Sequence, residues 1–213
     1  MHDIFQYDES IRKKGFRYIA GIDEAGRGPL AGPVVSAAVI LKPDVKIDGL
    51  KDSKKLSESK REQLYIEIKN SSLDIGIGIS TNDDIDRMNI LKATKLSMQK
   101  AVESLSIKPD ILIIDAVHLH SIDIKQIIHT KCESISASVA AASIIAKVTR
   151  DRIMKEYHIK YPQYNFIKHK GYSTKEHIRL IRQYGPCPIH RKSFFKVIMP
   201  ELPFLPVGRQ VDS

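Results

Sequence analysis

The sequence has few cysteines and no long apolar run. Its two cysteines, Cys132 and Cys187, lie far apart in the chain and lack the spacing of a metal-binding motif. We therefore expect a reduced protein rather than a disulfide-stapled secreted one. No segment reaches the roughly 18 apolar residues that a membrane span requires, and the N-terminus shows no basic region followed by an apolar stretch. These absences predict a cytoplasmic protein with no membrane partner.

Length and composition predict one folded core. The chain has 213 residues, of which 42% are hydrophobic, and it contains no internal repeat or low-complexity tract. A chain of this size buries one good core and has room for a small appended lobe.

The excess positive charge of +9 lies in one segment, residues 150–196. This segment holds 12 Lys or Arg and 3 Asp or Glu, while the rest of the chain holds 22 of each kind. Its cations alternate with tyrosines, phenylalanines and four histidines. Two interpretations stay open: a surface that binds phosphates and stacks on sugars or bases, or a solvated basic helix whose aromatic residues lie in the core.

Apolar periodicity predicts alternating strands and helices. Strands are expected at residues 18–23 and 32–41, paired antiparallel through a tight connection rich in glycine and proline. A helix capped by Ser57 is expected to run to about residue 70. A strand with one face on the core follows, and its alternating residues are Leu73, Ile75, Ile77 and Ile79.

The same pattern continues to residue 161. We expect a helix at 89–105, strands at 111–114 and 122–128, and a helix from 137 to about 161. The apolar stripe of the first of these helices is formed by Leu91, Met98, Val102 and Leu105. This order predicts an α/β fold with one mixed sheet flanked by helices, and the basic aromatic segment as a small helical C-terminal lobe.

Two adjacent carboxylates end the first strand. Asp23 and Glu24 are followed at once by Gly26-Arg27-Gly28. The carboxylates would repel a phosphodiester unless divalent cations intervene, whereas the glycine-flanked arginine offers backbone N–H groups and a guanidinium suited to phosphate. Metal-assisted phosphate chemistry is the first hypothesis, and ordinary turn residues are the alternative.

A third carboxylate, Asp115, closes the strand at 111–114. An ionised Asp after four apolar residues is costly to bury without a partner. Two interpretations stay open: a cap or turn, or a ligand of Mg²⁺, which prefers oxygen ligands. His118, His120 and His129 lack the spacing of a zinc site and are expected to be surface residues.

Several ordered motifs resemble those of ribonuclease HII. They are Gly21-Ile-Asp-Glu-Ala-Gly-Arg-Gly-Pro, Asp52-Ser-Lys-Lys-Leu-Ser, Ile114-Asp115, Ala142-Ser-Ile-Ile-Ala-Lys-Val-Thr-Arg-Asp, Lys168-His-Lys-Gly-Tyr-Ser and Gly185-Pro-Cys-Pro-Ile-His-Arg. The resemblance covers about residues 15–195. It implies the ribonuclease H-like fold and an endonuclease that cuts the RNA strand of RNA–DNA hybrids with Mg²⁺ or Mn²⁺, leaving 5′-phosphate and 3′-hydroxyl ends. It also implies a bacterial cytoplasmic enzyme, and a monomer is expected.

The resemblance assigns catalysis and metal binding to Asp23, Glu24, Asp115 and Glu133. The chain departs from the family pattern at two places, where it has Cys132-Glu133 in place of Gly-Asp or Ala-Asp, and Ala116 in place of the glycine after the central aspartate. Asp151 competes with Glu133 as the fourth carboxylate. Because Asp151 lies well inside the predicted helix, about 27 Å from Glu133 along an unbroken axis, we favour Glu133.

The resemblance also implies a substrate-binding set. Gly26, Arg27, Gly28 and Tyr172 would recognise a ribonucleotide followed by a deoxyribonucleotide, which permits cutting at a single ribonucleotide in duplex DNA. Further phosphate contacts are expected from Lys54, Lys55, Lys170 and the basic lobe. From the sequence alone, Tyr172 is either a core aromatic or, because Gly171 precedes it, part of an exposed turn.

Three segments are expected: a catalytic core at 15–160, a basic lobe at 161–196, and a tail at 197–213 to which the sequence assigns no structure. Two rival functions stay open. Another nuclease of the same broad fold, such as a junction resolvase or an integrase, would cut all-DNA substrates. A noncatalytic hybrid-binding protein would bind duplexes without metal-dependent turnover.

Overall fold

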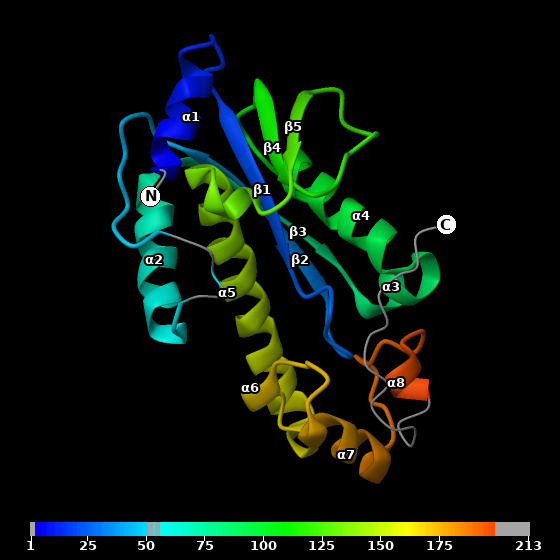
Figure 1. Cartoon of the computed structure of the whole chain (residues 1–213). Helices are drawn as coiled ribbons and strands as arrows, with labels where there is room; N and C mark the ends of the chain where they lie inside the picture. Colours follow the sequence, from blue (N-terminus) through cyan, green and yellow to red (C-terminus); the bar gives the residue numbers. More distant parts are fainter. Residues whose placement is uncertain (1–2, 51–52, 54–55, 199–213) are drawn as a thin grey trace.

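A computed structural model describes residues 3–50, 53 and 56–198. In it, a five-stranded mixed sheet carries helices on both faces (Figure 1). This arrangement confirms the predicted α/β class. The strands, in the spatial order β3-β2-β1-β4-β5, are β3 (Ser72–Ser80), β2 (Val34–Leu41), β1 (Ile19–Ala25), β4 (Ile111–Asp115) and β5 (Lys125–His129).

The sheet is antiparallel on one side of β1 and parallel on the other. β1 pairs antiparallel with β2, as predicted, and β2 pairs antiparallel with β3. β4 runs parallel to β1, with Ile114 opposite Ile22, and β5 runs parallel to β4. The register therefore places Asp23 and Asp115 at neighbouring positions, because each follows one member of the Ile22 and Ile114 pair.

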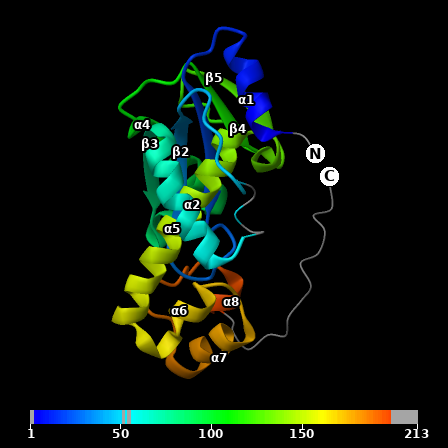
Figure 2. The same ribbon diagram turned by 90° about the vertical axis from the view of Figure 1, so that its left-hand side faces the viewer.

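Helices cover both faces of the sheet. One face is covered by α5 (Ala137–Lys160), with α2 (Glu58–Ser71) beside it, and the other by α4 (Ile90–Glu103) (Figures 1 and 2). These three helices confirm the predictions at 57–70, 89–105 and 137–161, including the Ser57 cap. α1 (Ile4–Arg12) and α3 (Asn82–Met88) were not predicted, and both are short helices.

Two details of the predicted packing differ in the structure. Leu91 is 45% exposed and lies off the buried stripe of α4. In β3, Ile75 and Ile77 are half-buried against the core that contains α5, as predicted, whereas Leu73 and Ile79 are exposed. The fully buried face of this strand is that of Gly76, Gly78 and Ser80. A Cβ at Gly78 would lie 1.9 Å from the carbonyl oxygen of Ser97, so α4 approaches this strand closely enough to exclude side chains.

The segment after α5 packs at one end of the sheet (Figures 1 and 2). It contains the short helices η3 (Pro162–Tyr164) and α6 (Phe166–His169), then α7 (Lys175–Tyr184) and α8 (Phe195–Ile198). Tyr164 and Phe166 are buried there. Tyr172 and Tyr184 are exposed, so only some of the aromatic residues of this segment lie in the core.

In the part of the chain that the structure describes, no helix combines the length and the apolarity needed to cross a bilayer.

Candidate active site

Asp23, Glu24 and Asp115 meet at the edge of the sheet where β1 and β4 end. Burial raises the pKa of Asp23 well above its usual value, and the negative charges of Glu24 and Asp115 raise it further. Burial also raises the pKa of Glu24, and Asp115 adds to that rise. The three carboxylates therefore lie close enough to repel one another, as ligands of a shared cation do before the cation binds.

Asp23 is held by its own strand and by α5. One carboxylate oxygen accepts the Glu24 N–H at 2.8 Å, and a hydrogen bond with Ser143 of α5 opposes the rise of the Asp23 pKa. The Ser143 hydroxyl also bonds that of Ser53 at 2.8 Å. A strand, a helix and the segment before α2 thus fix the position of this carboxylate.

Glu24 lies in the same strand, since β1 continues to Ala25. Consecutive strand residues point to opposite faces, and Glu24 turns toward Arg27, whose Nη1 lies 3.3 Å from its Oε1. This ion pair partly offsets the effect of burial on the pKa of Glu24.

Glu133 reaches the site from a different element, η2 (Cys132–Ser134). Its side chain is buried, and its Oε2 has no hydrogen-bond partner. The neighbouring Cys132 N–H donates to Asp115 at 3.2 Å. Burial raises the pKa of the Cys132 thiol to about 11, and the charges of Asp115, Glu133 and Asp23 add to it. Glu133 therefore lies near Asp115 and Asp23.

These residues fit a divalent cation. Their oxygens are hard ligands of the kind that Mg²⁺ and Mn²⁺ prefer. The Oε2 atom of Glu133 is buried without a partner, and the pKa values of Asp23 and Glu24 are raised. Both observations indicate negative charge that no described neighbouring group fully compensates. Among the described residues, however, no group of three or more Asp, Glu, His or Cys side chains is already gathered tightly enough to hold an ion.

A cleft of about 370 Å³ joins the carboxylates to the glycine-rich segment. It is lined by Glu24, Ala25, Gly26, Arg27, Gly28, Ser53, Asp115, Lys147 and Tyr172. Tyr172 is 40% exposed, so the core-aromatic interpretation of this residue is wrong. Its ring centroid lies 5.6 Å from Nζ of Lys147. The cleft thus combines acidic groups with cations, an aromatic ring and a glycine-rich backbone.

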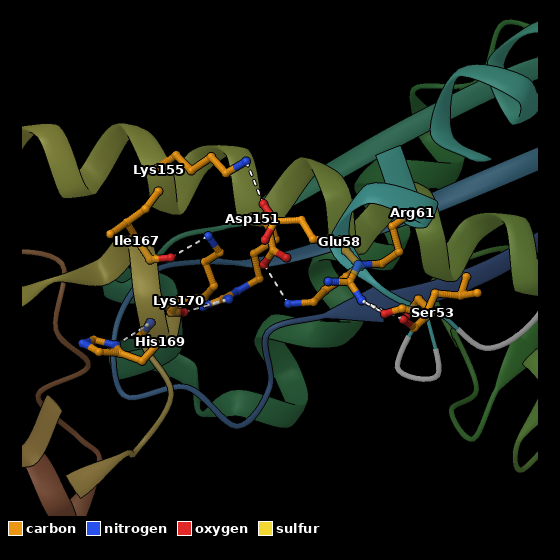
Figure 3. A network of polar contacts seen from close by, with 12 residues as sticks. Ser53, Glu58, Arg61, Asp151, Lys155, Ile167, His169 and Lys170 are labelled. Atoms are coloured by element: carbon orange, nitrogen blue, oxygen red, sulfur yellow. Dashed lines mark hydrogen bonds and ion pairs between the residues drawn. The ribbon is translucent and has the colours of Figure 1, made fainter. Parts of the chain in front are cut away.

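Lys170 is not among the residues that line this cleft, and it lies beside Ile167 and Asp151 (Figure 3). Its Nζ donates to the Ile167 carbonyl at 2.7 Å, and burial lowers the pKa of its ammonium. Glu58 and Asp151 carry the nearby negative charges. Lys54 and Lys55 fall outside the described residues. His118, His120 and His129 are exposed, as expected.

Asp151 is committed to an ion pair within α5. Its Oδ1 lies 2.7 Å from Nζ of Lys147, one helical turn away, and its side chain is buried. This partner compensates its charge, in contrast to the unpartnered oxygen of Glu133.

A model of the family described as ribonuclease HII matches residues 20–197. The chain belongs to the ribonuclease HII family. A ribonuclease HII of Clostridioides difficile (strain 630) is 57% identical over 186 residues, which are 87% of this chain and 73% of the relative. As a member of this family the chain is a ribonuclease H, a hydrolase with endonuclease activity.

Solved structures show the same fold. The ribonuclease H2 of Pyrococcus horikoshii OT3 superposes with a TM-score of 0.72 at 31% identity, covering 87% of this chain and 97% of that one. A Bst ribonuclease HIII in complex with Mn²⁺ superposes with a TM-score of 0.67, covering 86% of this chain and 68% of that one. At 22% identity this second likeness shows the fold alone.

Sequence reasoning missed Lys147 and Ser53 as residues that line the cleft, and Ser143 as a hydrogen-bond partner of Asp23. Lys147 is the first cation after ten residues of α5 that carry no charge, and this isolated charge is the signal that could have identified it. The two serines carry no such signal, since buried serines are common on helices that pack against a sheet.

Proposed function

We propose that this ribonuclease H cuts the RNA strand of RNA–DNA hybrids and also incises duplex DNA at a single ribonucleotide, leaving 5′-phosphate and 3′-hydroxyl ends. The observation that carries the proposal is the composition of the cleft. It places Glu24 and Asp115 in the same cavity as the Gly26–Gly28 backbone and Tyr172. A phosphodiester and its ribose would occupy this cavity together.

Asp23, Glu24, Asp115 and Glu133 would hold the divalent cations, Mg²⁺ or Mn²⁺. Support comes from the mutual repulsion of the first three carboxylates and from the unpartnered oxygen of Glu133. The Mn²⁺ in the Bst ribonuclease HIII structure is consistent with this assignment. Bound cations supply activation of the attacking water and stabilisation of the departing 3′ oxygen.

The Gly26–Gly28 backbone would recognise the ribose 2′-hydroxyl, the group that distinguishes RNA from DNA. Gly28 has no atom within 4 Å of the place where a Cβ would lie, so its backbone is open to a ligand. Arg27 is exposed and can reach a phosphate. Tyr172 would stack on the sugar or base beside the ribonucleotide.

The basic residues would bind the duplex backbone. Lys147 lines the cleft, and Lys54, Lys55 and Lys170 would add phosphate contacts nearby. In this proposal residues 15–160 form the catalytic core and residues 161–196 a lobe that extends the duplex-binding surface. The enzyme would act as a monomer in the cytoplasm, and light scattering of the purified chain would test its oligomeric state.

The decisive experiment uses a duplex that contains one ribonucleotide, incubated with Mg²⁺, Mn²⁺ or EDTA. We expect metal-dependent cutting on the 5′ side of the ribonucleotide and none of the all-DNA duplex. Asp23→Asn should abolish turnover, whereas Asp123→Asn, at an exposed site away from the cleft, should not. Cutting of all-DNA duplex would favour a resolvase-like or integrase-like activity, and binding without turnover would contradict the catalytic assignment.

A further inference from the structure

Two fully buried arginines lie beneath the cleft. Arg150 of α5 and Arg191 are both 0% exposed. In the part of the chain that the structure describes, neither forms an ion pair with a carboxylate. Burial lowers the pKa of Arg191 to about 9, and the charge of Arg150 contributes. Because a buried charge is costly unless it is compensated, these two side chains need another partner.

Backbone carbonyls provide the compensation. Most of them belong to one segment, residues 26–33, which we name the glycine-rich loop. Arg191 donates to Arg27 at 2.8 Å, Gly26 at 2.5 Å, Gly32 at 3.0 Å and Pro33 at 3.3 Å. Arg150 donates to Pro33 at 3.0 Å, Ala31 at 3.1 Å and Lys170 at 3.0 Å.

The inward carbonyls determine which way the N–H groups face. In a trans peptide, the C=O of one residue and the N–H of the next point in opposite directions. The carbonyls of Gly26 and Arg27 are turned onto Arg191, so the N–H groups of Arg27 and Gly28 point away from it. Both residues line the cleft. The buried guanidinium thereby orients two donors toward the place of the ribose.

Arg150 connects the same loop to Tyr172. It bonds the Lys170 carbonyl as well as those of Ala31 and Pro33, and its guanidinium carbon lies 5.7 Å from the Tyr172 ring centroid. A Cβ at Gly26 would lie 2.2 Å from Arg150 Nε, so the loop rests directly on this side chain. The planar guanidinium of Arg150 therefore sets the distance between the glycine-rich loop and Tyr172.

We propose that Arg150 and Arg191 are positioning residues for ribose recognition, which orient the Arg27 and Gly28 N–H groups and set their distance from Tyr172. The proposal rests on the proposed function, in which the loop and Tyr172 contact the ribonucleotide. Arg150 and Arg191 themselves touch no substrate, because both are fully covered. Their effect is on selectivity rather than on the chemical step.

The test compares two substrates in Arg150→Lys and Arg191→Lys. Lysine keeps the charge but loses the planar fork that bridges several carbonyls. On a duplex with one ribonucleotide the enzyme can cut from only one binding position, whereas a continuous RNA strand offers many such positions. Loosening the loop should therefore lower kcat/KM on the first substrate at least 10-fold more than on the second. Because both arginines act on one loop, the double variant should lower this ratio by far less than the product of the single effects.

Met98→Ala is the matched control for lost stability. Met98 belongs to α4 and is fully buried in the cluster between this helix and the sheet, which contains no residue of the glycine-rich loop. With every protein assayed at the same interval below its own Tm, Met98→Ala should affect both substrates equally. If the ratio of kcat/KM on the two substrates is unchanged in the lysine variants, the arginines have a purely structural role and the proposal is overturned. If the wild-type chain fails to cut at a single ribonucleotide, the proposed function itself fails before any variant is compared.

Amide hydrogen exchange of the free wild-type protein tests the orientation without any variant. The N–H groups of Arg27 and Gly28 should exchange rapidly. Those of Leu30 and Gly32 should be protected, because they donate to Gly171 at 2.8 Å and to Ile189 at 2.9 Å. Equal protection of all four would contradict the outward orientation, even if the lysine variants cannot be purified.

Discussion

Asp115 accepts a hydrogen bond from the backbone N–H of Cys132 at 3.2 Å. This contact joins the end of β4 to η2 and brings the next residue, Glu133, to the site. The backbone is strained next to both partners of this hydrogen bond: Ala116, which follows Asp115, has a φ of 58°, and Lys131, which precedes Cys132, has a φ of 61°. Only glycine adopts this left-handed region without a steric penalty. The carboxylates are thus held in place at a local conformational cost.

Replacing Ala116 with glycine should stabilise the fold. The left-handed conformation penalises Ala116 by about 1–2 kcal/mol, and glycine loses part of this gain through its more flexible unfolded state. We expect Ala116→Gly to raise the free energy of unfolding by about 0.5–1 kcal/mol, measured by urea denaturation. The control is Ala101→Gly, inside α4, which should be destabilising. Loss of stability in Ala116→Gly would contradict the strain.

Asp115→Asn should remove activity and preserve the fold. The amide oxygen can still accept the Cys132 N–H, but the negative charge is lost. Because bound cations provide several kcal/mol of transition-state stabilisation, we expect kcat to fall about 100-fold or more. Hybrid binding should persist, since it depends on basic residues elsewhere. Steady-state kinetics and a filter-binding assay measure the two effects, and wild-type turnover would remove Asp115 from the catalytic set.

Glu133 and Asp151 should differ in what their removal costs. Glu133→Ala is expected to lower the rate markedly, and Glu133→Asp should stay active because a carboxylate remains. Asp151→Ala should reduce mainly stability or binding, since it leaves Lys147 without its partner at 2.7 Å. Melting temperatures and turnover should be measured on all three variants. Loss of catalysis in Asp151→Ala with fold and affinity intact, together with a harmless Glu133→Ala, would reverse the assignment.

Tyr172→Ala should damage cutting at a single ribonucleotide. The ring is exposed at the cleft and flanked by two cations, so its removal deletes a stacking surface worth about 1–3 kcal/mol, or roughly 5- to 150-fold in rate. Tyr172→Phe keeps that surface and is the matched control. The measurement is kcat/KM on the single-ribonucleotide duplex. An active Tyr172→Ala would show that another group recognises the ribose.

Mild acid should destabilise the protein through two buried histidines. Burial lowers the pKa of His177 from 6.5 to about 3 and that of His190 to about 4. Both are fully buried and bonded through their Nε2 atoms at 3.0 Å, while Nδ1 of His177 bonds the Tyr172 carbonyl and Nδ1 of His190 accepts the Cys187 N–H. Neutral rings satisfy this chain of hydrogen bonds.

The sign of the effect follows from the lowered pKa values. Below about pH 6.5 these two histidines bind protons in the unfolded chain but not in the folded one, so their contribution to stability falls as the pH drops toward 4. From pH 7 to pH 5 the loss is about 2 kcal/mol for each histidine. Urea denaturation across this range should show a shallower pH dependence in His177→Gln than in the wild type. His118→Gln, at an exposed position, should leave the dependence unchanged.

Much of the sheet and of its acidic edge could be predicted from the sequence. Apolar runs at 18–23 and 111–114 identify two buried strands, and each is followed by a carboxylate. The structure places both strands parallel and adjacent, so Asp23 and Asp115 meet. Local patterns succeed here because burial of a strand and the position of its last residue are both properties of a short stretch of chain.

The packing details could not be predicted in the same way. The buried face of β3 is the glycine face, because α4 approaches it too closely for side chains. The distance between a helix and a strand cannot be read from the sequence of either one. The apolar alternation of Ile75 and Ile77 correctly indicated a face that packs on a core. It could not show that a helix also covers the glycine face, since periodicity shows which residues share a face but not which neighbour covers each face.

What the sequence by itself determined is the order of the elements, the carboxylates at the strand ends and the family motifs, because these depend on residue types at short spacing. Only the tertiary structure decided the partners of Arg150 and Arg191. Both look like ordinary members of a basic segment in the sequence, yet both are fully buried and bond the carbonyls of a loop more than a hundred residues away. Such compensation of a buried charge by distant carbonyls arises only when the folded chain brings the two segments together.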